Sequence, residues 1–370
     1  MIGDLILDRY TFGDAERVSQ EAPVILLRAD RREARLGGAA NVCQMLRGLE
    51  AEVVCAGVVG DDAGGEEVRT LLEEAGVETG AVTTDASRPT TVKERFIGRA
   101  ANRHPHQILR VDSEVREPID ARVGERLLAA VIESLPATDI VLISDYDKGV
   151  CTPELLAELI RAAREAAVPV LVDPIRGGDY GRYRGATGLT PNRLETELAT
   201  GIKITSTDDA YADGEKLCRD HDLQMAFVTL DKDGVALVRR DGSGQTFPTR
   251  VREVYDITGA GDMMLAMIGA CLAAGVPAED ACRLGNIAGG LEVEQVGVAV
   301  IPRAAIRSEI IAGAGGSRAP IDRATMARLA DGIDLSAWAE GLTAYGIPPR
   351  LTPVLRAADL QSPVAIAILT

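Results

Sequence analysis

The stretch VYDITGAGDMMLA, residues 254–266, places an aspartate directly behind a Gly-Ala-Gly sequence. Four apolar residues that follow are spaced three and four apart, as on the buried face of a helix: Met264, Met267, Ile268 and Cys271. Glycines ahead of a helix let a ligand approach the backbone, and the free N–H groups of the first turn bind anions. Asp262 adds a carboxylate to such a site, which suits a reaction in which the two groups serve different atoms. The alternative is that Asp262 only caps the helix.

A second pair of polar residues, Asn192 and Glu195, lies in TPNRLE behind the stretch TGLT. An amide and a carboxylate three residues apart in a strand-to-helix turn could orient Mg²⁺-bound water and phosphate oxygens. The same spacing is that of a capping box, which would only close the start of a helix. Both interpretations stay open on this stretch alone.

Polar residues also follow two other expected strands. SDYDKG contains Lys148, which could hold a phosphate or be solvated in a turn, and LVDP contains Asp173, which could lie near a metal ion or nucleotide. Asp173 could equally just end its strand before Pro174, because the residue before a proline is restricted.

Near the N-terminus, GDLILDRY and LGGAANV supply five further candidates: Asp4, Asp8, Gly37, Gly38 and Asn41. Aspartates of this kind fix sugar hydroxyls, paired glycines let the backbone approach a ligand, and an asparagine at a helix start can read one. The alternatives are a turn aspartate and a tight connection between a strand and a helix.

The elements that position these residues alternate between short apolar strands and amphipathic helices. Strands are expected at 51–60, 139–145, 168–173 and 225–230, and helices at 64–76, 121–135 and 153–167. Apolar strands separated by helices predict a parallel sheet covered on both faces. Ligands in such folds bind at the carboxyl ends of the strands, where the polar residues above lie.

Two segments break this rhythm, at 22–36 and 89–112. Each has mixed or alternating polarity and no helix, a pattern typical of an antiparallel sheet with one face in water. We expect both to form a small β lid, with inserts at about 20–36 and 89–112, that closes over a site or forms a dimer contact. Residues 1–314 then form one domain, and 315–370, which begin in a Gly-rich stretch, form an extension without catalytic spacing.

The composition excludes several classes of protein. The 370-residue chain has a net charge of −16, which argues against nucleic acid or an anionic membrane as a partner. Six scattered cysteines, without a C-x-x-C pair, indicate buried thiols in a reducing compartment. No stretch is long and apolar enough to cross a bilayer, and no basic-then-apolar signal segment stands at the N-terminus, so we expect a cytoplasmic protein.

The order and spacing of GGAAN, VVGDD, N-x-x-E and DITGAGD across about residues 3–312 resemble the ribokinase-like (PfkB) family of carbohydrate kinases. Within that family, the stretches GDLILDRY, EAPV, TVKERF, RVD, ISDYDKG and RYRGATGLTPN are similar to those of the heptose 7-phosphate kinases, including the kinase half of the bifunctional enzyme of ADP-heptose synthesis. The resemblance implies an α/β fold, a three-layer αβα sandwich with a mainly parallel central sheet and a small β lid.

The resemblance also assigns residues to roles. It implies that Asp262 takes a proton from a sugar hydroxyl while the backbone N–H groups of Gly259, Ala260 and Gly261 hold the transferred phosphoryl group. The ATP site would include Asn192, Arg193, Leu194, Glu195, Thr229, Gly234, Asn286 and Gly289, with Glu195 near Mg²⁺ through water. The sugar site would include Asp4, Asp8, Gly37, Gly38 and Asn41. Lys93, Arg110 and Lys148 would hold the phosphate that the substrate already carries.

The implied activity is ATP-dependent phosphorylation of D-glycero-D-manno-heptose 7-phosphate at the anomeric hydroxyl, by a homodimer joined through the lid. ATP and Mg²⁺ are the implied cofactors, with room for a monovalent cation. The sequence departs from the family at its start, where only two residues precede Gly3, and after Pro174, where Ile175 and Arg176 replace an expected lysine. The alternatives are a kinase for another sugar or nucleoside, and a catalytically silent regulatory protein that binds sugar or nucleotide.

Overall fold

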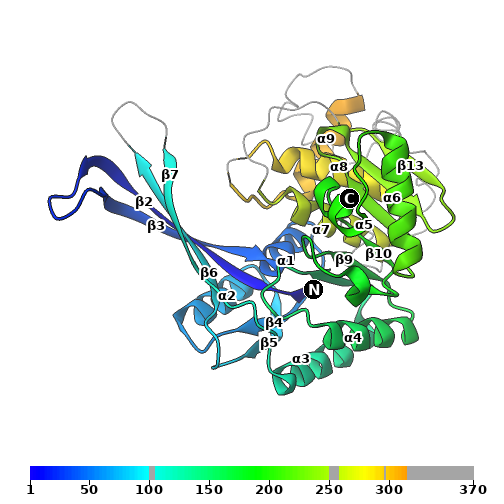
Figure 1. Cartoon of the computed structure of the whole chain (residues 1–370), viewed down its shortest axis with the longest axis horizontal. Coiled ribbons are helices and arrows are strands. Elements are labelled where there is room, and N and C mark those ends of the chain that lie inside the picture. The colour runs from blue at the N-terminus through cyan, green and yellow to red at the C-terminus, as the bar shows by residue number, and fades with distance from the viewer. Residues whose placement is uncertain (100–104, 250–257, 296, 315–370) are drawn as a thin grey trace, which may run out of the picture.

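The structure, a computed structural model, describes residues 1–99, 105–249, 258–295 and 297–314 (Figure 1). The expected extension, 315–370, lies outside the described residues, as do residues 254–257 of the stretch that precedes Asp262.

The described residues contain a nine-stranded sheet in the order β13-β12-β11-β10-β9-β8-β1-β4-β5. Its strands are β1 (Ile2–Gly3), β4 (Val54–Val59), β5 (Glu78–Thr84), β8 (Val141–Ser144), β9 (Val170–Asp173), β10 (Gly188–Leu189), β11 (Met225–Thr229), β12 (Val235–Arg239) and β13 (Gly244–Phe247). The strands from β5 to β11 are parallel, and β12 and β13 add an antiparallel edge. The mainly parallel sheet that the sequence indicates is therefore confirmed.

Helices cover both faces of this sheet because its strands are apolar on both sides. Neighbouring residues of β8 show the two sides, since Leu142 packs into one hydrophobic cluster and Ile143 into the other. One face carries α1 (Ala39–Gly48), α2 (Ala63–Glu74), α7 (Ala260–Ala273), α8 (Ala278–Glu292) and α9 (Arg303–Ala314). The other carries α3 (Ala121–Ser134), α4 (Pro153–Glu165) and α6 (Thr207–Asp220), and α5 (Arg193–Thr200) packs beside α6. All six cysteines are free and buried.

A second sheet, in the order β3-β2-β6-β7, forms the lid and projects from the body as a long arm (Figure 1). Its strands are β2 (Leu5–Val18), β3 (Ile25–Gly38), β6 (Thr91–Arg99) and β7 (His106–Ser113). The two expected segments supply β3, β6 and β7, but β2 was not expected in the lid. It follows β1 after a single residue, so its apolar start is indistinguishable in sequence from a core strand.

The lid returns to the body through two glycines that lead directly into α1 (Figure 1). Gly38 has φ +55°, and a Cβ added there would lie 2.5 Å from the backbone oxygen of Asp4. Only glycine fits this left-handed, crowded position. The tight strand-to-helix connection, which was the alternative interpretation of these glycines, is therefore present, and it places the start of α1 against the end of β1.

The central strand β1 contains only two residues, and a cavity of about 570 Å³ lies at its start, lined in part by Met1, Val54 and Val141. None of the helices in the described ranges combines the length and apolar character needed to cross a membrane.

Candidate active site

Asp262 is the third residue of α7, a helix that is apolar on all sides and buried. Gly259 precedes the helix with φ +99°, the left-handed region that favours glycine. The Asp262 side chain is 5% exposed. Its Oδ2 accepts a hydrogen bond from Nδ2 of Asn41 (2.6 Å), and its Oδ1 accepts one from the hydroxyl of Tyr146 (2.9 Å). Both oxygens are thus held by residues distant in sequence.

The environment of Asp262 is unlike that of a capping residue. Asp209 occupies the same third position in α6, where hydrogen bonds from Thr205 and Ser206 lower the pKa of its carboxyl to about 2. Burial, against the hydrogen bonds from Asn41 and Tyr146, raises the pKa of Asp262 to about 6. A carboxyl poised near neutral pH inside a polar pocket has the character of a general base.

Asn41 is fully buried in the first turn of α1, behind the lid glycines. Its Oδ1 accepts a hydrogen bond from Nε2 of Gln44 (2.6 Å), so its amide nitrogen is turned toward Asp262. Asn41 thereby joins the helix that follows the lid to the helix that carries the carboxylate.

Two lid strands bring charged residues toward Asp262. Asp8 of β2 pairs in register with Lys93 of β6, and both influence the pKa of Asp262. Nη1 of Arg95 lies 2.6 Å from Oδ1 of Asp8, and a Cβ added at Gly37 would meet Oδ2 of Asp8 at 2.6 Å. The lid therefore presents an ion pair and a lysine at the site, with Gly37 leaving the space that Asp8 occupies.

The other two predicted phosphate-binding cations are already paired. Nζ of Lys148, which is buried, lies 2.9 Å from Glu114. Arg110 of β7 lies opposite Arg95 in the lid, half exposed, and its Nε is 2.9 Å from Asp112. Because cross-strand partners point to the same face of a sheet, Arg110, Arg95 and Lys93 share one face of the lid.

Asp4 is fully buried, and its carboxylate holds the loop that follows β8. It accepts hydrogen bonds from the backbone N–H groups of Tyr146 (2.8 Å), Lys148 (3.1 Å) and Val150 (3.2 Å). Burial and the neighbouring Asp145 raise the pKa of Asp4 to about 6. Asp4 stays a candidate for sugar binding, and in the structure its carboxylate also holds the loop that carries Tyr146.

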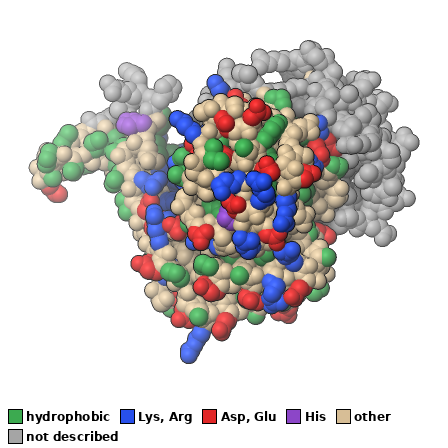
Figure 2. Space-filling view, turned by 45° about the vertical axis from the view of Figure 1, so that its right-hand side comes forward, with side chains coloured by type: hydrophobic (Ala, Val, Ile, Leu, Met, Phe, Trp, Pro, Cys, Tyr) green, Lys and Arg blue, Asp and Glu red, His purple; other side chains and the backbone are tan. Residues whose placement is uncertain are grey.

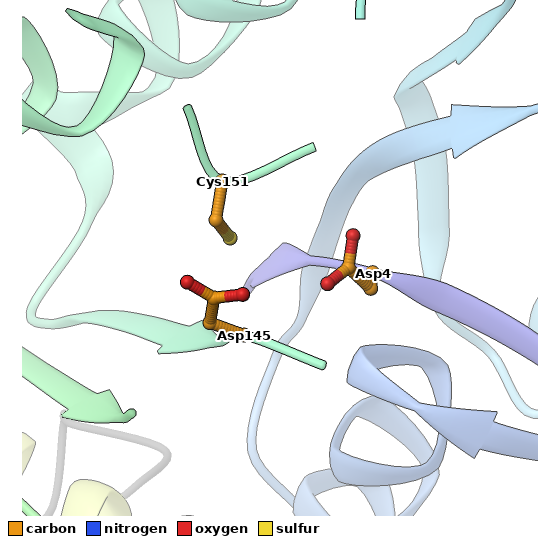
Figure 3. A group of neighbouring side chains, drawn as sticks. All are labelled: Asp4, Asp145 and Cys151. Atoms are coloured by element: carbon orange, nitrogen blue, oxygen red, sulfur yellow. The ribbon is translucent and has the colours of Figure 1, made fainter. Parts of the chain in front are cut away.

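Three side chains gather in this region: Asp4, Asp145 and Cys151 (Figure 3). One carboxylate oxygen of each aspartate and the Sγ of the cysteine lie within 4.8 Å of one another. Asp145 accepts hydrogen bonds from the hydroxyl of Tyr183 (2.7 Å) and from Nη1 of Arg182 (3.2 Å). Both aspartates therefore already accept hydrogen bonds from protein donors. Together they anchor the loop that follows β8.

A cavity of about 500 Å³ lies at the carboxyl ends of β8, β9 and β11 and reaches Gly261. It contains three of the residues predicted for the nucleotide: Asn192, Glu195 and Thr229. Tyr146, Asp173 and Arg176 line it as well. The cavity adjoins Asp262 through Gly261 and Tyr146, so a ligand in it would lie beside the start of α7.

Asn192 and Glu195 form the capping box, which was one of the two open interpretations. Oδ1 of Asn192 accepts from the N–H of Glu195 (2.9 Å), and Oε2 of Glu195 accepts from the N–H of Asn192 (2.8 Å). Both residues still line the cavity, so capping does not remove them from it.

The cavity carries an excess of acids. Burial and the nearby carboxylates of Glu195 and Asp262 raise the pKa of Asp173 well above its usual value, and burial raises that of Glu195. A divalent cation would relieve this repulsion, and carboxylate and amide oxygens are the ligands that Mg²⁺ prefers. The residues present therefore fit a bound Mg²⁺.

The remaining residues predicted for the nucleotide do not line this cavity. Arg193 pairs with Asp231 (3.0 Å) and Asp233 (2.9 Å), and Leu194 is exposed. The others have packing roles in the described structure: Gly234 makes the β11–β12 turn at φ +96°, Nδ2 of Asn286 donates to the backbone oxygen of Phe247 (2.8 Å), and Gly289 packs on Met264.

Sequence reasoning missed two side chains that the structure brings to the site, Tyr146 and Arg95. The tyrosine lies inside SDYDKG, where its charged neighbours have the more obvious chemistry. Arg95 could have been found from the strand alternation of β6, which turns residues 93 and 95 to the same face.

Comparison with solved structures identifies the fold. Ribokinase from Arabidopsis thaliana, complexed with ribose and ATP, matches with a TM-score of 0.65 and 19% identity over 82% of this chain and 96% of its own. Phosphofructokinase-2 from Escherichia coli, in complex with potassium, matches with a TM-score of 0.66 and 18% identity over 83% and 96%. The chain therefore has the ribokinase-like α/β fold.

The family follows from sequence. The model of the pfkB family of carbohydrate kinases matches residues 2–304, and the chain belongs to this family. The bifunctional protein HldE of Geobacter metallireducens is 44% identical over 306 residues, which cover 83% of this chain and 61% of that protein. HldE of Paramagnetospirillum magneticum is 40% identical over 299 residues, 81% of this chain and 60% of that protein. The chain thus spans about three fifths of the length of these relatives. Its membership of the pfkB family makes it a carbohydrate kinase.

Proposed function

We propose that this kinase transfers the γ-phosphoryl group of ATP to the anomeric hydroxyl of D-glycero-D-manno-heptose 7-phosphate, giving the 1,7-bisphosphate. The observation that carries the proposal is the placement of Asp262, held by Asn41 and Tyr146 at the start of α7 and faced by Lys93 of the lid. The similarity to proteins named HldE supports the heptose substrate.

In the proposed reaction, Asp262 accepts the proton of the sugar hydroxyl as that oxygen attacks the γ-phosphorus. The first-turn N–H groups at Gly259, Ala260 and Gly261 stabilise the charge on the transferred group, because they point out of the helix start. Phosphoryl transfer needs positioning and charge stabilisation more than covalent help, which a rigid helix end supplies.

ATP and Mg²⁺ are the proposed cofactors, with the phosphates in the 500 Å³ cavity. Asp173, Asn192 and Glu195 would hold the hydrated ion, and Arg176 would lie near the phosphates. When bound, Mg²⁺ neutralises charge on the phosphate oxygens. A monovalent cation is a further proposed cofactor, because the similar phosphofructokinase-2 structure is in complex with potassium. Comparing the activity in K⁺ with that in Na⁺ tests this.

The lid cations are proposed to hold the 7-phosphate. Lys93 is the strongest candidate, because it faces the site and its pKa is lowered by burial, which indicates a desolvated cation. Arg110 and Lys148, each in an ion pair, would exchange carboxylates for the phosphate. We further propose that residues 1–314 form the kinase domain, that 315–370 follow as an extension, and that the enzyme acts in the cytoplasm in ADP-heptose synthesis for lipopolysaccharide.

ADP release with Mg·ATP tests the function against heptose 7-phosphate, the unphosphorylated heptose, fructose 6-phosphate and ribose. Turnover of heptose 7-phosphate with kcat/KM at least 100-fold above that of the free heptose supports the proposal, since a fixed phosphate contributes several kcal/mol of binding. Preferential turnover of another sugar would be consistent with the proposed mechanism but would rule out heptose 7-phosphate as the substrate. Binding of ATP and sugar without ADP release would instead favour the regulatory protein.

A homodimer joined through the lid is also proposed. β7 is an edge strand of the lid, and it exposes Leu109 (54%) and Val111 (46%). Figure 2 shows the lid arm extending from the body with hydrophobic side chains along it. Exposed apolar strand edges of this kind mark contacts between chains.

Replacing Leu109 with glutamate is expected to convert a dimer to a monomer in sedimentation velocity at micromolar concentration, because it buries a charge in the contact. Ile132→Glu, at an exposed apolar residue of α3, is the matched control and should leave the mass unchanged. A monomeric wild-type protein, or a Leu109→Glu variant that remains dimeric, would contradict the proposed interface.

A further inference from the structure

Tyr146 lies in the loop between β8 and α4 and contacts the carboxylate proposed as the base. Its hydroxyl donates to Oδ1 of Asp262 (2.9 Å), while Asn41 donates to Oδ2 (2.6 Å). Each carboxylate oxygen has two lone pairs, so each keeps one for a substrate hydroxyl. The two donors fix the plane of the carboxylate and thereby the direction of its remaining lone pairs.

The Tyr146 hydroxyl stays a donor at every working pH. Burial and the carboxylates of Asp262 and Asp173 raise the pKa of Tyr146 well above its usual value of 10. The phenol therefore does not ionise beside Asp262, and it supplies a constant hydrogen bond to the charged form of the carboxylate.

Tyr146 is itself fixed from two directions. Its backbone N–H donates to the buried carboxylate of Asp4 (2.8 Å), which also holds the rest of the loop. Nζ of Lys93 lies 5.4 Å from the centre of the tyrosine ring, a cation–π contact from the lid. The ring is thus held between the body and the lid.

We propose that Tyr146 is a positioning residue for phosphoryl transfer, whose hydroxyl orients the Asp262 carboxylate toward the sugar hydroxyl. The inference rests on the proposed function for the role of Asp262 as base. It gives Tyr146, which also lines the 500 Å³ cavity, a role toward Asp262, and it connects the lid to that carboxylate through Lys93.

Other groups also face Asp262 and set the background against which Tyr146 acts. They are Asp8 of β2, Lys93 of β6 and Asp173 at the end of β9, together with the neutral amide of Asn41. Removing the tyrosine hydroxyl leaves these groups in place and removes one hydrogen bond to the ionised form. Loss of such a bond raises the pKa of a carboxyl.

Tyr146→Phe tests the inference with little change in shape. The acid limb of kcat/KM is expected to move up by about one pH unit, and kcat at pH 7.5 to fall about tenfold, with KM for the sugar within about twofold. Tyr180→Phe is the matched control, because the buried hydroxyl of Tyr180 has no hydrogen-bond partner in the described structure. This control should keep the wild-type profile.

A second measurement needs no substrate. The carboxyl carbon of Asp262, identified by its loss in Asp262→Asn, is followed by NMR in protein labelled at the aspartate carboxyls. Its midpoint should lie near pH 6 in the wild type and about one unit higher in Tyr146→Phe. An unshifted midpoint together with an unshifted acid limb would overturn the inference. If no sugar is turned over, the proposed function fails, and the NMR midpoint still decides whether Tyr146 controls Asp262.

Discussion

Asp262→Asn is expected to lower kcat by about 10³-fold at pH 7.5, because the amide cannot accept the proton of the sugar hydroxyl. KM for ATP should change little, since the cavity lined by Asn192, Glu195 and Thr229 is untouched. Asp209→Asn is the matched control, at the same third position of another helix. It should keep the wild-type kcat. A fall of less than tenfold in Asp262→Asn would remove the residue from the role of base.

The same substitution is expected to stabilise the protein above neutral pH. The folded state raises the pKa of Asp262 from 3.8 to about 6, so folding favours the protonated form. The stability that this contributes is present below about pH 4 and is lost as the pH rises through 6. Because asparagine does not ionise, its advantage over the wild type should grow by about 2 kcal/mol between pH 4 and pH 8. Urea unfolding at the two pH values measures this difference, and a helix cap would show the opposite trend.

Asp4→Ala is expected to lower the free energy of unfolding by about 3 kcal/mol at pH 7.5, because three buried N–H groups lose their acceptor. Relief from burying a carboxylate, whose pKa is raised to about 6, offsets part of the loss. Urea unfolding is the measurement. Asp120→Ala, which removes one exposed cap of α3, is the control and should cost about 1 kcal/mol or less.

The loop that Asp4 holds carries Tyr146, so Asp4→Ala should also lower kcat in protein that remains folded at 20 °C. An Asp4→Ala protein with wild-type stability would show that the loop is held by other contacts. An unstable variant with full kcat would separate the anchoring of the loop from the positioning of Asp262.

Much of the central sheet could be predicted from the sequence because its strands are short apolar stretches between helices. β4, β8, β9 and β11 fall within the expected ranges, and α2, α3 and α4 match the expected helices to within about two residues. The lid was only partly predicted. Its strand β2 has no turn before it, so nothing in the local pattern separates residues 5–18 from the core strand that they continue.

The site was predictable where one short motif carries it and not where the fold assembles it. Asp262 and the start of α7 lie together in the chain, so their chemistry shows in the motif. The contact of Asp262 with Asn41 joins residues 221 apart, and its contact with Tyr146 joins residues 116 apart. For Asp4, a sugar contact and a loop anchor look identical in sequence, because only the position of three backbone N–H groups distinguishes them.

The two glycines that join the lid to α1 bear on the hydrolysis of ATP in the absence of a sugar. Lid strand β3 passes through Gly38 into the helix that carries Asn41, so the lid and the amide that holds the carboxylate belong to one continuous piece of chain. Under the proposed function, a sugar phosphate would contact both Lys93 of the lid and Asp262 of the body, whereas a water molecule would contact only one of them. If the proposed function holds, we expect hydrolysis of ATP without a sugar to be much slower than phosphorylation of the sugar.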